Sequence, residues 1–526
     1  MKGQVTKRLR RIFAFALCLC LACGATFSSH AAQNQCDCGV SPIVYVAALG
    51  SATLYLDAGT PAERVLFRPT DEATQQLVMQ LLLPAARYAL DRNAEVFAGS
   101  IANAVKGMLG ELAMDENGDS NPRVTTKTTL PADPAHGIDK DYYFGYDFRV
   151  DPMVTADRLH EFIEHVEQLT GHEKVSLRAS SLGGIVTMTY LQKYGSGDID
   201  ACIFQCCPVL GVAVAGDLFN KKIKLDPDAL VRYGVQVLPQ VDNGELLKPL
   251  IEALDCAGIF DALLGVGDAL VNDLKDEIYE QLLIPVFGRM PGLWALVPDV
   301  SYESAKAVML DGSASPILLD RLDYYHYNVM GKAGEILNGA KAGGVRIMFL
   351  AGYNMQREPF VESYLNNSDA VDDTIYNAPG AIVAEIGTTL GEGYTQAVDD
   401  GHNHLSSDGV IDASTCLLPE NTWFAKNMLH STVHDGHRGL YRLFLESDAS
   451  FNVHSDARYP QFLVDDTANK RLLPLTSETD PGTAGMEKPS CCNPVDWQAL
   501  AAQVIALLTD FICRVVPALQ NAFAAV

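Results

Sequence analysis

The chain has 526 residues and is acidic, with 65 Asp and Glu against 39 Lys and Arg and a formal net charge of −26 at pH 7. A surface of this sign repels phosphate backbones and anionic lipid, so nucleic acid is excluded as an electrostatic partner. Hydrophobic residues make up 48% of the chain, which is enough for a large core in one domain with insertions, or in two domains.

The first 32 residues have the pattern of a secretory signal peptide. A basic stretch over 2–11 precedes an apolar run over 12–22, and small residues lead to Ala31 and Ala32, where we expect cleavage. Removing this leader takes the formal charge to about −31, and the mature chain is expected to be secreted. A surface lipoprotein anchored at Cys23 is the alternative, but cysteine stands three positions earlier, where such signals carry leucine.

Ten of the thirteen cysteines follow the leader. An exported chain can oxidise them, but adjacent pairs such as Cys206-Cys207 and Cys491-Cys492 leave the disulfide pairing open. No C-x-x-C pattern is present after the leader, so we predict neither a metal nor a cofactor.

An apolar strand is predicted from near Ser41, running into a small-residue loop that ends at Ser51. In a serine hydrolase the loop after an early strand supplies one backbone N–H of the oxyanion hole, and the residue after the nucleophile supplies the other. By position these donors are Leu49, or its neighbour Ala48, and Leu182. A plain structural loop would have the same composition, so this assignment depends on a nucleophile further along the chain.

Alternating strands and helices follow. A helix is predicted over residues 70–110, and a polar surface loop over 114–140. An aromatic strand that ends in a charged pair is predicted over 142–149. The stretch from there to Gly171 is predicted to be a helix with one apolar face. A further strand is expected around Ile203. This order implies a mostly parallel sheet covered on both faces.

The stretch from Lys174 to Gly195 is the most informative part of the sequence. A short apolar strand ends at Ala179, a helical pattern begins near Ile185, and Ser180-Ser181-Leu182-Gly183-Gly184 lies between them. A strand, a tight turn and a helix are the context of a nucleophile elbow, in which Ser181 takes a strained conformation and the residues two before and two after it must be small. An ordinary strand-to-helix connection with small residues is the alternative interpretation.

The C-terminal half continues the pattern after a long interruption. Residues 208–340 read as an apolar helical insertion, in which Trp294 is expected to pack the insertion onto the sheet. Strands are expected at 345–351 and 422–425, and the second is followed by His430, His434 and His437. The spacing of the three histidines also suits a zinc site, but no cysteine or carboxylate pattern completes one.

Three motifs occur in the order found in one known family. They are VYVAALGS at 44–51, GYDFR at 145–149 and SSLGG at 180–184. The chain resembles the α/β-hydrolase superfamily, and within it the lecithin:cholesterol acyltransferase-like lipases and acyltransferases, whose motifs are V-P-G-x-x-G-S, YDWR and HSxGG. This chain departs from them at Ala47-Ala48, which replace proline and glycine, and at Ala179 and Ser180, which replace glycine and histidine.

The resemblance implies a catalytic triad in the order Ser, Asp, His. It places the acid in a D-G-x-V segment, for which the nearest match is Asp408, although an Asp-Gly pair is also a common turn. His430 comes first after the strand at 422–425, so we expect it to be the base, whereas His434 and His437 are expected at the start of the closing helix as solvated or capping residues.

The sequence therefore predicts an α/β-hydrolase fold with a mostly parallel central sheet and a large helical cap. The predicted segments are a signal peptide (1–32), a core in two parts (33–207 and 341–445), the cap (208–340), a linker (446–490) and a C-terminal helix (491–526). Asp510, Arg514 and Pro517 interrupt that helix, which argues against a membrane span and leaves contact with a lipid surface, through the helix or the cap, as an expectation.

The expected function is hydrolysis of carboxylic esters, most naturally of lipids, through an acyl-serine intermediate on Ser181 with His430 and Asp408. Two alternatives remain open: an acyltransferase of the same fold, and a surface or binding protein that keeps the fold without the reaction.

Overall fold

The computed structural model describes residues 38–67, 110–236 and 278–482, apart from residues 128, 225, 311, 313 and 431, together with Cys36 and isolated positions within 96–106 and 275–276. The predicted leader, most of the predicted helix at 70–110 and the predicted C-terminal helix lie outside the described residues. So does the middle of the predicted cap.

The centre of the fold is an eight-stranded sheet in the order β13-β12-β11-β8-β7-β6-β1-β5. Every neighbouring pair is parallel except β12 and β13, which confirms the predicted mostly parallel sheet. The strands are β1 (Ile43–Val46), β5 (Asp141–Phe144), β6 (Val175–Ser180), β7 (Ile199–Gln205), β8 (Arg346–Tyr353), β11 (Thr422–Lys426), β12 (Phe462–Asp466) and β13 (Arg471–Pro474).

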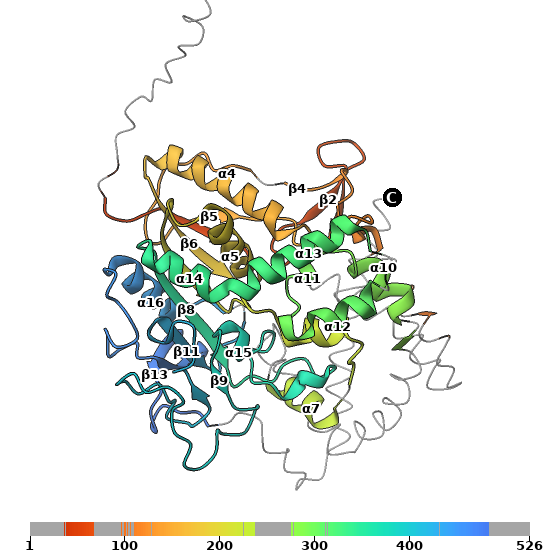
Figure 1. Ribbon diagram of the computed structural model, residues 1–526. Helices are drawn as coiled ribbons and strands as arrows, with labels where there is room; N and C mark the ends of the chain where they lie inside the picture. The colour runs from red at the N-terminus through yellow and green to blue at the C-terminus, as the bar shows by residue number, and fades with distance from the viewer. Residues whose placement is uncertain are drawn as a thin grey trace, which may run out of the picture.

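Helices cover both faces of this sheet because its strands carry apolar side chains on both sides. Val44, Leu177 and Phe349 pack on one face under α4 (Pro152–Thr170), α5 (Leu182–Tyr194) and α14 (Ala333–Ala342). Ile43 and Met348 belong to the opposite face, which α16 (Asp435–Glu446) covers. Figure 1 shows α4, α5 and α14 grouped together, with α16 beyond β8 and β11.

The helix predicted to end at Gly171 is α4, and its two ends explain its length. Asp151 caps the first turn by accepting a hydrogen bond from the Met153 N–H, and Pro152 begins the helix where no N–H is needed. Gly171 ends it with φ 73°, a left-handed conformation that favours glycine.

The described parts of the predicted cap are helical. They are α6 (Ala213–Phe219), α7 (Pro227–Gln236), η4 (Tyr279–Leu283), α10 (Ile284–Phe287), α11 (Pro291–Trp294), α12 (Asp299–Met309), α13 (Pro316–Asn328) and η5 (Met330–Lys332). The predicted boundary at residue 340 falls inside α14, whose Ala333 and Leu337 belong to the core cluster on the sheet.

Trp294 was expected to join this insertion to the sheet, but it lies in the insertion's own core. Its ring is fully buried against Phe219, with ring centroids 4.8 Å apart, and its indole N–H donates to the Gly288 carbonyl at 2.9 Å. The cluster around it consists of residues of the insertion, so Trp294 stabilises these helices against one another.

Smaller elements complete the described fold. A three-stranded sheet contains β2 (Leu54–Leu56), β3 (Arg64–Phe67) and β4 (Val124–Thr126), and a two-stranded one contains β9 (Ile382–Val383) and β10 (Ile411–Asp412). Single turns of helix occur at η1 (Gly110–Leu112), η6 (Glu362–Leu365), α15 (Thr374–Asn377), η7 (Pro419–Asn421) and η8 (Thr467–Asn469).

The prediction of a linker over 446–490 is wrong for its middle part. β12 pairs with β11 and β13 pairs with β12, so these residues extend the central sheet. The Asp465-Asp466 pair hid the strand in the sequence, because acidic residues are depleted in strands. Asp465 is nevertheless buried, where it accepts a hydrogen bond from His434 at 2.7 Å.

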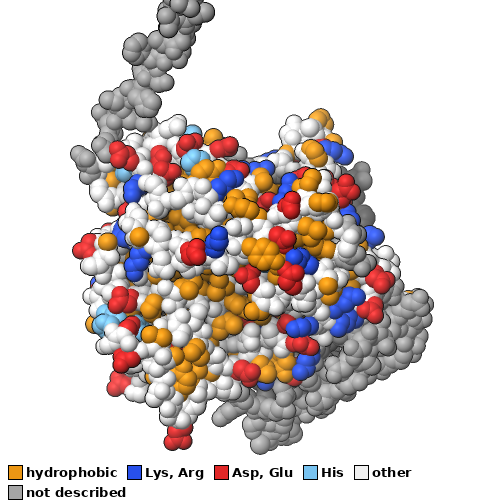
Figure 2. All heavy atoms as spheres, viewed as in Figure 1, with side chains coloured by type: hydrophobic (Ala, Val, Ile, Leu, Met, Phe, Trp, Pro, Cys, Tyr) orange, Lys and Arg blue, Asp and Glu red, His pale blue; other side chains and the backbone are white. Residues whose placement is uncertain are grey.

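The described surface mixes acidic, basic and apolar side chains on the face that Figure 2 shows. Within the described part of the chain, each helix is too short or too polar to cross a bilayer. The six cysteines that the structure describes are all free thiols, and four of them, Cys202, Cys206, Cys207 and Cys416, are buried.

Candidate active site

Ser181 lies between β6 and α5 in the conformation that the sequence predicts for an elbow. Its φ is 54° and its ψ is −129°, a left-handed backbone that residues with a side chain rarely adopt. Its side chain makes no capping hydrogen bond to α5, so the hydroxyl is not used to hold the helix. The residue is largely buried at the carboxyl end of β6.

The two glycines after Ser181 are required by close packing. A Cβ on Gly183 would lie 2.2 Å from the Val46 carbonyl oxygen, and one on Gly184 would lie 2.4 Å from the Cys207 Cβ. At Gly183 the start of α5 packs against the end of β1, and at Gly184 it packs against the residues that follow β7. The need for small residues in this turn is therefore confirmed, since real Cβ atoms do not approach so closely.

Strand order and turn together identify the architecture. The turn with positive φ follows a central parallel strand, and the strands to either side appear in the order β8-β7-β6-β1-β5. The fold is that of the α/β-hydrolases.

The predicted oxyanion donors lie on the two segments that Gly183 brings together. Leu182 is buried and is the first residue of α5, so its N–H has no acceptor within the helix. Leu49 is exposed in the loop after β1, while the N–H of Ala47 is already donated to the Phe144 carbonyl at 3.2 Å. In the loop after β1, Ala48 and Leu49 are therefore the residues whose N–H groups suit the second donor of the oxyanion hole.

His430 follows β11 and is held by Asp369. Its Nδ1 lies 2.9 Å from Oδ2 of Asp369, and its backbone N–H donates to the Asp369 carbonyl, also at 2.9 Å. The Asp369 carboxylate is fully buried and accepts further hydrogen bonds from the Val371 and Asp372 N–H groups and from the Asn377 side chain. Such a carboxylate fixes both the ring orientation and the tautomer of the histidine.

Ser181 follows β6 and His430 follows β11, two strands that end at the same edge of the sheet with β7 and β8 between them. The Ser181 N–H donates to the Gln205 carbonyl at the end of β7, and the Gln205 side chain donates to the Thr432 carbonyl at 3.1 Å, two residues after His430. The thiol of Cys206 also lies within 4.8 Å of the polar atoms of Asp369 and His430. The serine, the histidine and Asp369 are thus gathered at the carboxyl edge of β6, β7, β8 and β11.

Asp408, which the sequence suggested as the acid, does not contact His430. Its Oδ2 lies 2.9 Å from both the Lys426 Nζ and the Tyr353 hydroxyl, and its Oδ1 accepts from the Ser406 hydroxyl at 2.6 Å. These hydrogen bonds lower the pKa of Asp408 against the opposing effect of its burial. The prediction that Asp408 holds the histidine is wrong: this carboxylate ties the end of β8 to the end of β11.

The sequence missed Asp369 because its turn lacks the expected glycine. Ala370 follows Asp369 with φ 81°, the conformation that favours glycine, so the aspartate stands in Asp-Ala instead of Asp-Gly. Gly409, with φ 70°, supplies an Asp-Gly pair at a turn without this role. The signal that the sequence does offer is the glycine at position 352, directly after the predicted strand at 345–351, because a glycine in a strand can mark a close approach of another segment. In the structure, a Cβ on Gly352 would lie 2.7 Å from the Asp369 side chain and 2.5 Å from the Met428 carbonyl.

A second carboxylate faces the same histidine. Oδ2 of Asp372 lies 3.6 Å from the His430 Nδ1 and is buried without a hydrogen-bond partner. Burial lowers the pKa of His430, but the charges of Asp369 and Asp372 outweigh it and raise that pKa to about 10. Burial raises the pKa of Asp372 to about 8, against the attraction of His430.

The buried pair Arg357 and Asp373 anchors this loop. Both side chains are fully buried and form an ion pair, and the other Asp373 oxygen accepts from the Ala213 N–H at 2.7 Å at the start of α6. Two buried opposite charges in one loop are costly to separate, so they fix the position of the loop that carries Asp369. They also join it to the helical insertion.

Asp147 and Arg149, the charged pair of the GYDFR motif, form a buried ion pair that stabilises the fold. Arg149 is fully buried and makes two hydrogen bonds to Asp147, at 2.9 and 2.6 Å, and one to the Leu112 carbonyl at 2.7 Å. The pair therefore supports the turn between β5 and α4 and lies outside the residues that hold His430.

His434 and His437 form a separate buried group with Asp465. Nδ1 of His434 accepts the Gly436 N–H at 3.1 Å, and Nδ1 of His437 accepts the His434 N–H at 3.3 Å, so His434 caps α16 as expected. Burial and the neighbouring His434 lower the pKa of His437 to about 3, which keeps it neutral. With both Nδ1 atoms used as acceptors, both Nε2 atoms carry the proton and face Asp465, which does not fit a metal ion.

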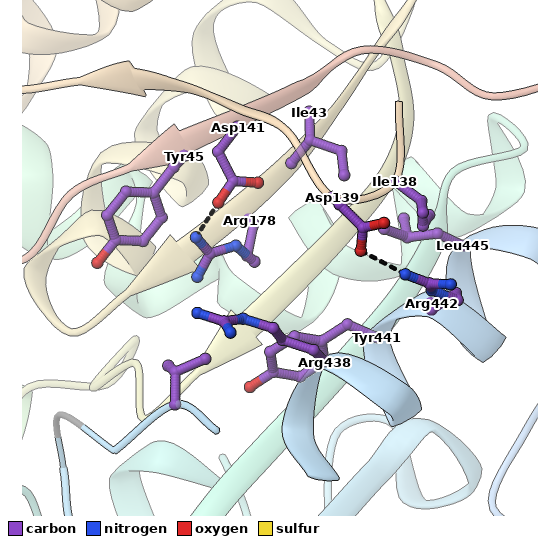
Figure 3. A pocket seen from close by; sticks show the side chains of 11 residues that line it. Ile43, Tyr45, Ile138, Asp139, Asp141, Arg178, Arg438, Tyr441, Arg442 and Leu445 are labelled. Atoms are coloured by element: carbon purple, nitrogen blue, oxygen red, sulfur yellow. Dashed lines mark hydrogen bonds and ion pairs between the residues drawn. The ribbon is translucent and has the colours of Figure 1, made fainter. Parts of the chain in front are cut away.

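A cavity of about 510 Å³ lies on the α16 face of the sheet, and Figure 3 shows the side chains that line it. Arg178 pairs there with Asp141, and Arg442 with Asp139. Arg438 also lines the cavity, and it pairs with the exposed Asp435 at 3.5 Å. Val433 borders it three residues beyond His430.

Comparisons with known proteins add little to this description. No family model matches the chain. No curated protein matches it either. Among solved structures, a chain from the crystal structure of a Tle4–Tli4 complex is similar to it with a TM-score of 0.31 and 11% sequence identity, over 77% of this chain and 97% of that chain. So weak a likeness carries no argument, and the fold assignment rests on the sheet and the turn at Ser181.

Proposed function

We propose that this protein is a serine hydrolase of carboxylic esters that works through an acyl-serine intermediate. The observation that supports it is the combination of Ser181 at φ 54° on the turn after β6 with His430, held by Asp369 at 2.9 Å, after β11 at the same carboxyl edge of the sheet. A base oriented by a buried carboxylate and a serine hydroxyl on a strained turn, not used to cap the following helix, are the two parts that ester hydrolysis by serine needs.

In the proposed reaction, the Ser181 Oγ attacks the ester carbonyl carbon while Nε2 of His430 accepts its proton. Asp369 holds the Nδ1–H and balances the charge on the ring. As the tetrahedral intermediate collapses, His430 gives the proton to the leaving alcohol and the acyl group stays on Ser181. Water, deprotonated by His430, then attacks the acyl carbon. The bond from this carbon to the Ser181 Oγ breaks, His430 gives its proton to the Oγ, and the acid is released.

The negative oxygen of the tetrahedral intermediate needs donors that are in place beforehand. The Leu182 N–H and the N–H of Leu49 or Ala48 are assigned this role, because Gly183 allows the two segments to lie against each other. The start of α5 adds a favourable field for a negative charge, as helix N-termini do.

Lipid esters are the proposed substrate class, on the three motifs shared with lecithin:cholesterol acyltransferase-like enzymes. The helical insertion is joined to the loop that carries Asp369 by the hydrogen bond from the Ala213 N–H to Asp373. Transfer to an alcohol uses the same acyl-enzyme as hydrolysis, so an acyltransferase remains the alternative within this chemistry. Export through the predicted leader is part of the proposal.

A fluorophosphonate probe tests the proposal directly, because it reacts only with an activated serine. We expect one label per chain on Ser181, lost in Ser181→Ala and in His430→Ala. Ser180→Ala and His434→Ala are the matched controls, since Ser180 ends β6 and His434 caps α16. They should label normally and hydrolyse a short nitrophenyl ester at close to the unmodified rate.

A protein without the reaction is the second candidate. Two buried carboxylates, Asp369 at 2.9 Å and Asp372 at 3.6 Å, face the His430 Nδ1 and raise the pKa of the ring, and a protonated ring cannot act as a base. Labelling should therefore be attempted from pH 7 to pH 10. A folded protein that remains unlabelled over this whole range is a binding protein with a hydrolase fold, and labelling that persists in Ser181→Ala would place the nucleophile elsewhere.

A further inference from the structure

Four side chains that can bind a metal meet far from Ser181, at the amino-terminal ends of the strands. Cys36 and Cys38 precede β1, His136 precedes β5, and His172 lies between α4 and β6. Because these three strands are parallel, the side chains gather where the strands begin, whereas Ser181 lies where β6 ends. The ligand atoms of all four residues lie within 4.8 Å of one another.

Three S···N separations between these atoms match the corresponding edges of a tetrahedron around zinc. Zn–S bonds of about 2.3 Å and Zn–N bonds of about 2.05 Å at tetrahedral angles give S···N separations of about 3.6 Å. Sγ of Cys38 lies 3.3 Å from Nε2 of His136 and 3.5 Å from Nε2 of His172. Sγ of Cys36 lies 3.6 Å from Nε2 of His136.

The histidines present the correct nitrogen. Nδ1 of His136 lies 3.0 Å from the Pro134 carbonyl, an acceptor only, so Nδ1 carries the proton and Nε2 keeps its lone pair toward the thiols. A backbone carbonyl behind a metal-binding histidine is the usual outer support of such a ligand. Nδ1 of His172 is buried without a partner, so no other hydrogen bond opposes the use of Nε2.

This arrangement contrasts with His434, His437 and Asp465, where the backbone N–H groups occupy Nδ1 and force the protons onto Nε2. It also contrasts with the surface group of His402, Glu420 and His454, which has no thiol. Two thiolates with two imidazoles are a usual ligand set of structural zinc, and they disfavour the hard ions Mg²⁺ and Ca²⁺.

We propose that Cys36, Cys38, His136 and His172 bind one structural zinc ion. The ion joins the segment before β1 to the loop before β5 and to the end of α4, next to the hydrogen bond from the Cys36 N–H to the Gly171 carbonyl. Four protein ligands leave no open position, so the site is structural and takes no part in ester chemistry. Binding removes the proton from both thiols and protects the thiolates from oxidation.

Metal content of the purified full-length protein tests the proposal. We expect about one zinc per chain by elemental analysis, and a loss of at least tenfold in Cys38→Ser and in His136→Asn. The double variant His402→Asn/His454→Asn, which removes the surface group instead, should keep its zinc. Circular dichroism checks that each variant is folded, and the unmodified protein, stripped by a chelator and reloaded with zinc, gives a second measurement that needs no variant.

Cobalt replacement identifies the ligands. The stripped protein reloaded with Co²⁺ should show the thiolate-to-metal charge-transfer band and the strong visible bands of a tetrahedral site, and both should be absent in Cys36→Ser/Cys38→Ser. A chelator should also lower the melting temperature of the unmodified protein, because metal binding adds to folding stability.

Three results would overturn the proposal. They are a folded protein without stoichiometric zinc, the same zinc content in Cys38→Ser as in the surface double variant, and a Cys36–Cys38 disulfide found by mass spectrometry in freshly purified protein. None of these results depends on ester hydrolysis, so they leave the role of Ser181 to its own test.

Discussion

At the residue scale, Ser181 and Ala370 are among the residues near the proposed reaction whose backbone conformations favour glycine. Ser181 has φ 54° and Ala370, next to Asp369, has φ 81°. Each such residue costs on the order of 1–3 kcal/mol and persists only where the surrounding packing dictates it. The strain holds the Ser181 hydroxyl clear of α5 and turns the chain so that Asp369 receives the N–H groups of Val371 and Asp372.

The two candidate acids can be separated by matched substitutions. Asp369→Asn should lower kcat for a short nitrophenyl ester by roughly 10⁴-fold with little change in KM, because the amide stabilises the wrong tautomer of His430. Asp408→Asn should keep kcat within about tenfold and destabilise the fold by about 1–3 kcal/mol, since Tyr353 and Lys426 lose a buried acceptor. Steady-state kinetics and thermal unfolding measure both effects, and the reverse pattern would restore Asp408 as the acid.

The pH dependence of the reaction should report the two carboxylates beside His430. The base acts only when neutral, and its pKa is raised to about 10, so kcat/KM should rise with pH from 7 toward 10. Asp372→Asn removes one of the charges that raise this pKa, so the rising limb should move to lower pH by roughly one unit, with higher activity at pH 7.

Asp408→Asn is the control for this profile, because its carboxylate faces Lys426 and should leave the limb where it is. A limb that stays in place or moves to higher pH in Asp372→Asn would show that Asp372 does not set the protonation of the base.

At the scale of elements, the site depends on how closely two loops approach β8. The loop after β8 carries Asp369, the loop after β11 carries His430, and Gly352 is the position at which both approach the strand. Asn354 and Asn427 follow the two strands with positive φ, and their side chains hydrogen-bond to each other at 2.6 Å. The relative position of acid and histidine is therefore set by the backbone of β8 and β11.

Gly352→Ala should disturb both loops at once. Its Cβ would lie 2.5 Å from the Met428 carbonyl and 2.7 Å from the Asp369 side chain, so the loops must move apart at a cost of roughly 1–3 kcal/mol. We expect a lower melting temperature together with a loss of kcat. Gly334→Ala is the matched control, because its Cβ would meet only Leu417 at 3.5 Å, within α14 where alanine is favoured by about 0.5–1 kcal/mol.

Full activity and unchanged stability in Gly352→Ala would mean that the approach of the two loops is looser than the structure indicates. A loss of stability in Gly334→Ala of the same size would mean that the effect is not specific to β8.

At the scale of the whole molecule, the proposed zinc site lies where the parallel strands begin, and the proposed reaction site lies where they end. The metal would secure Cys36 and Cys38, which lie only a few positions after the predicted cleavage at Ala31 or Ala32. A segment that starts a mature chain frays unless it is tied down, and zinc is a means of doing so without a disulfide.

Export is testable on the same scale. Material recovered outside the cell should begin at Ala32 or Gln33 when its N-terminus is sequenced, because the basic head, apolar run and small residues fit a cleaved leader. A lipid-modified N-terminus at Cys23 would instead show a surface lipoprotein, and a chain that keeps Met1 would contradict both.

The sequence by itself determined the features that depend on neighbours in the chain. The periodicity of strands and helices predicted the parallel sheet and the strand and helix on either side of Ser181, and the small residues at 179–184 predicted its strained turn. The position of His434 at the start of a helix could be read in the same way, since a cap is a local interaction.

Only the tertiary structure decided which distant groups meet. Asp369 and Asp408 both follow β8 in polar stretches, and the choice between them depends on how each loop folds back over Gly352 and Lys426. Asp465 concealed β12 because its burial is compensated by His434, 31 residues away. Cys38 and His172 are separated by 134 residues, and no local pattern encodes their approach, because it is the parallel pairing of β1 with β5 and β6 that brings the starts of these strands together.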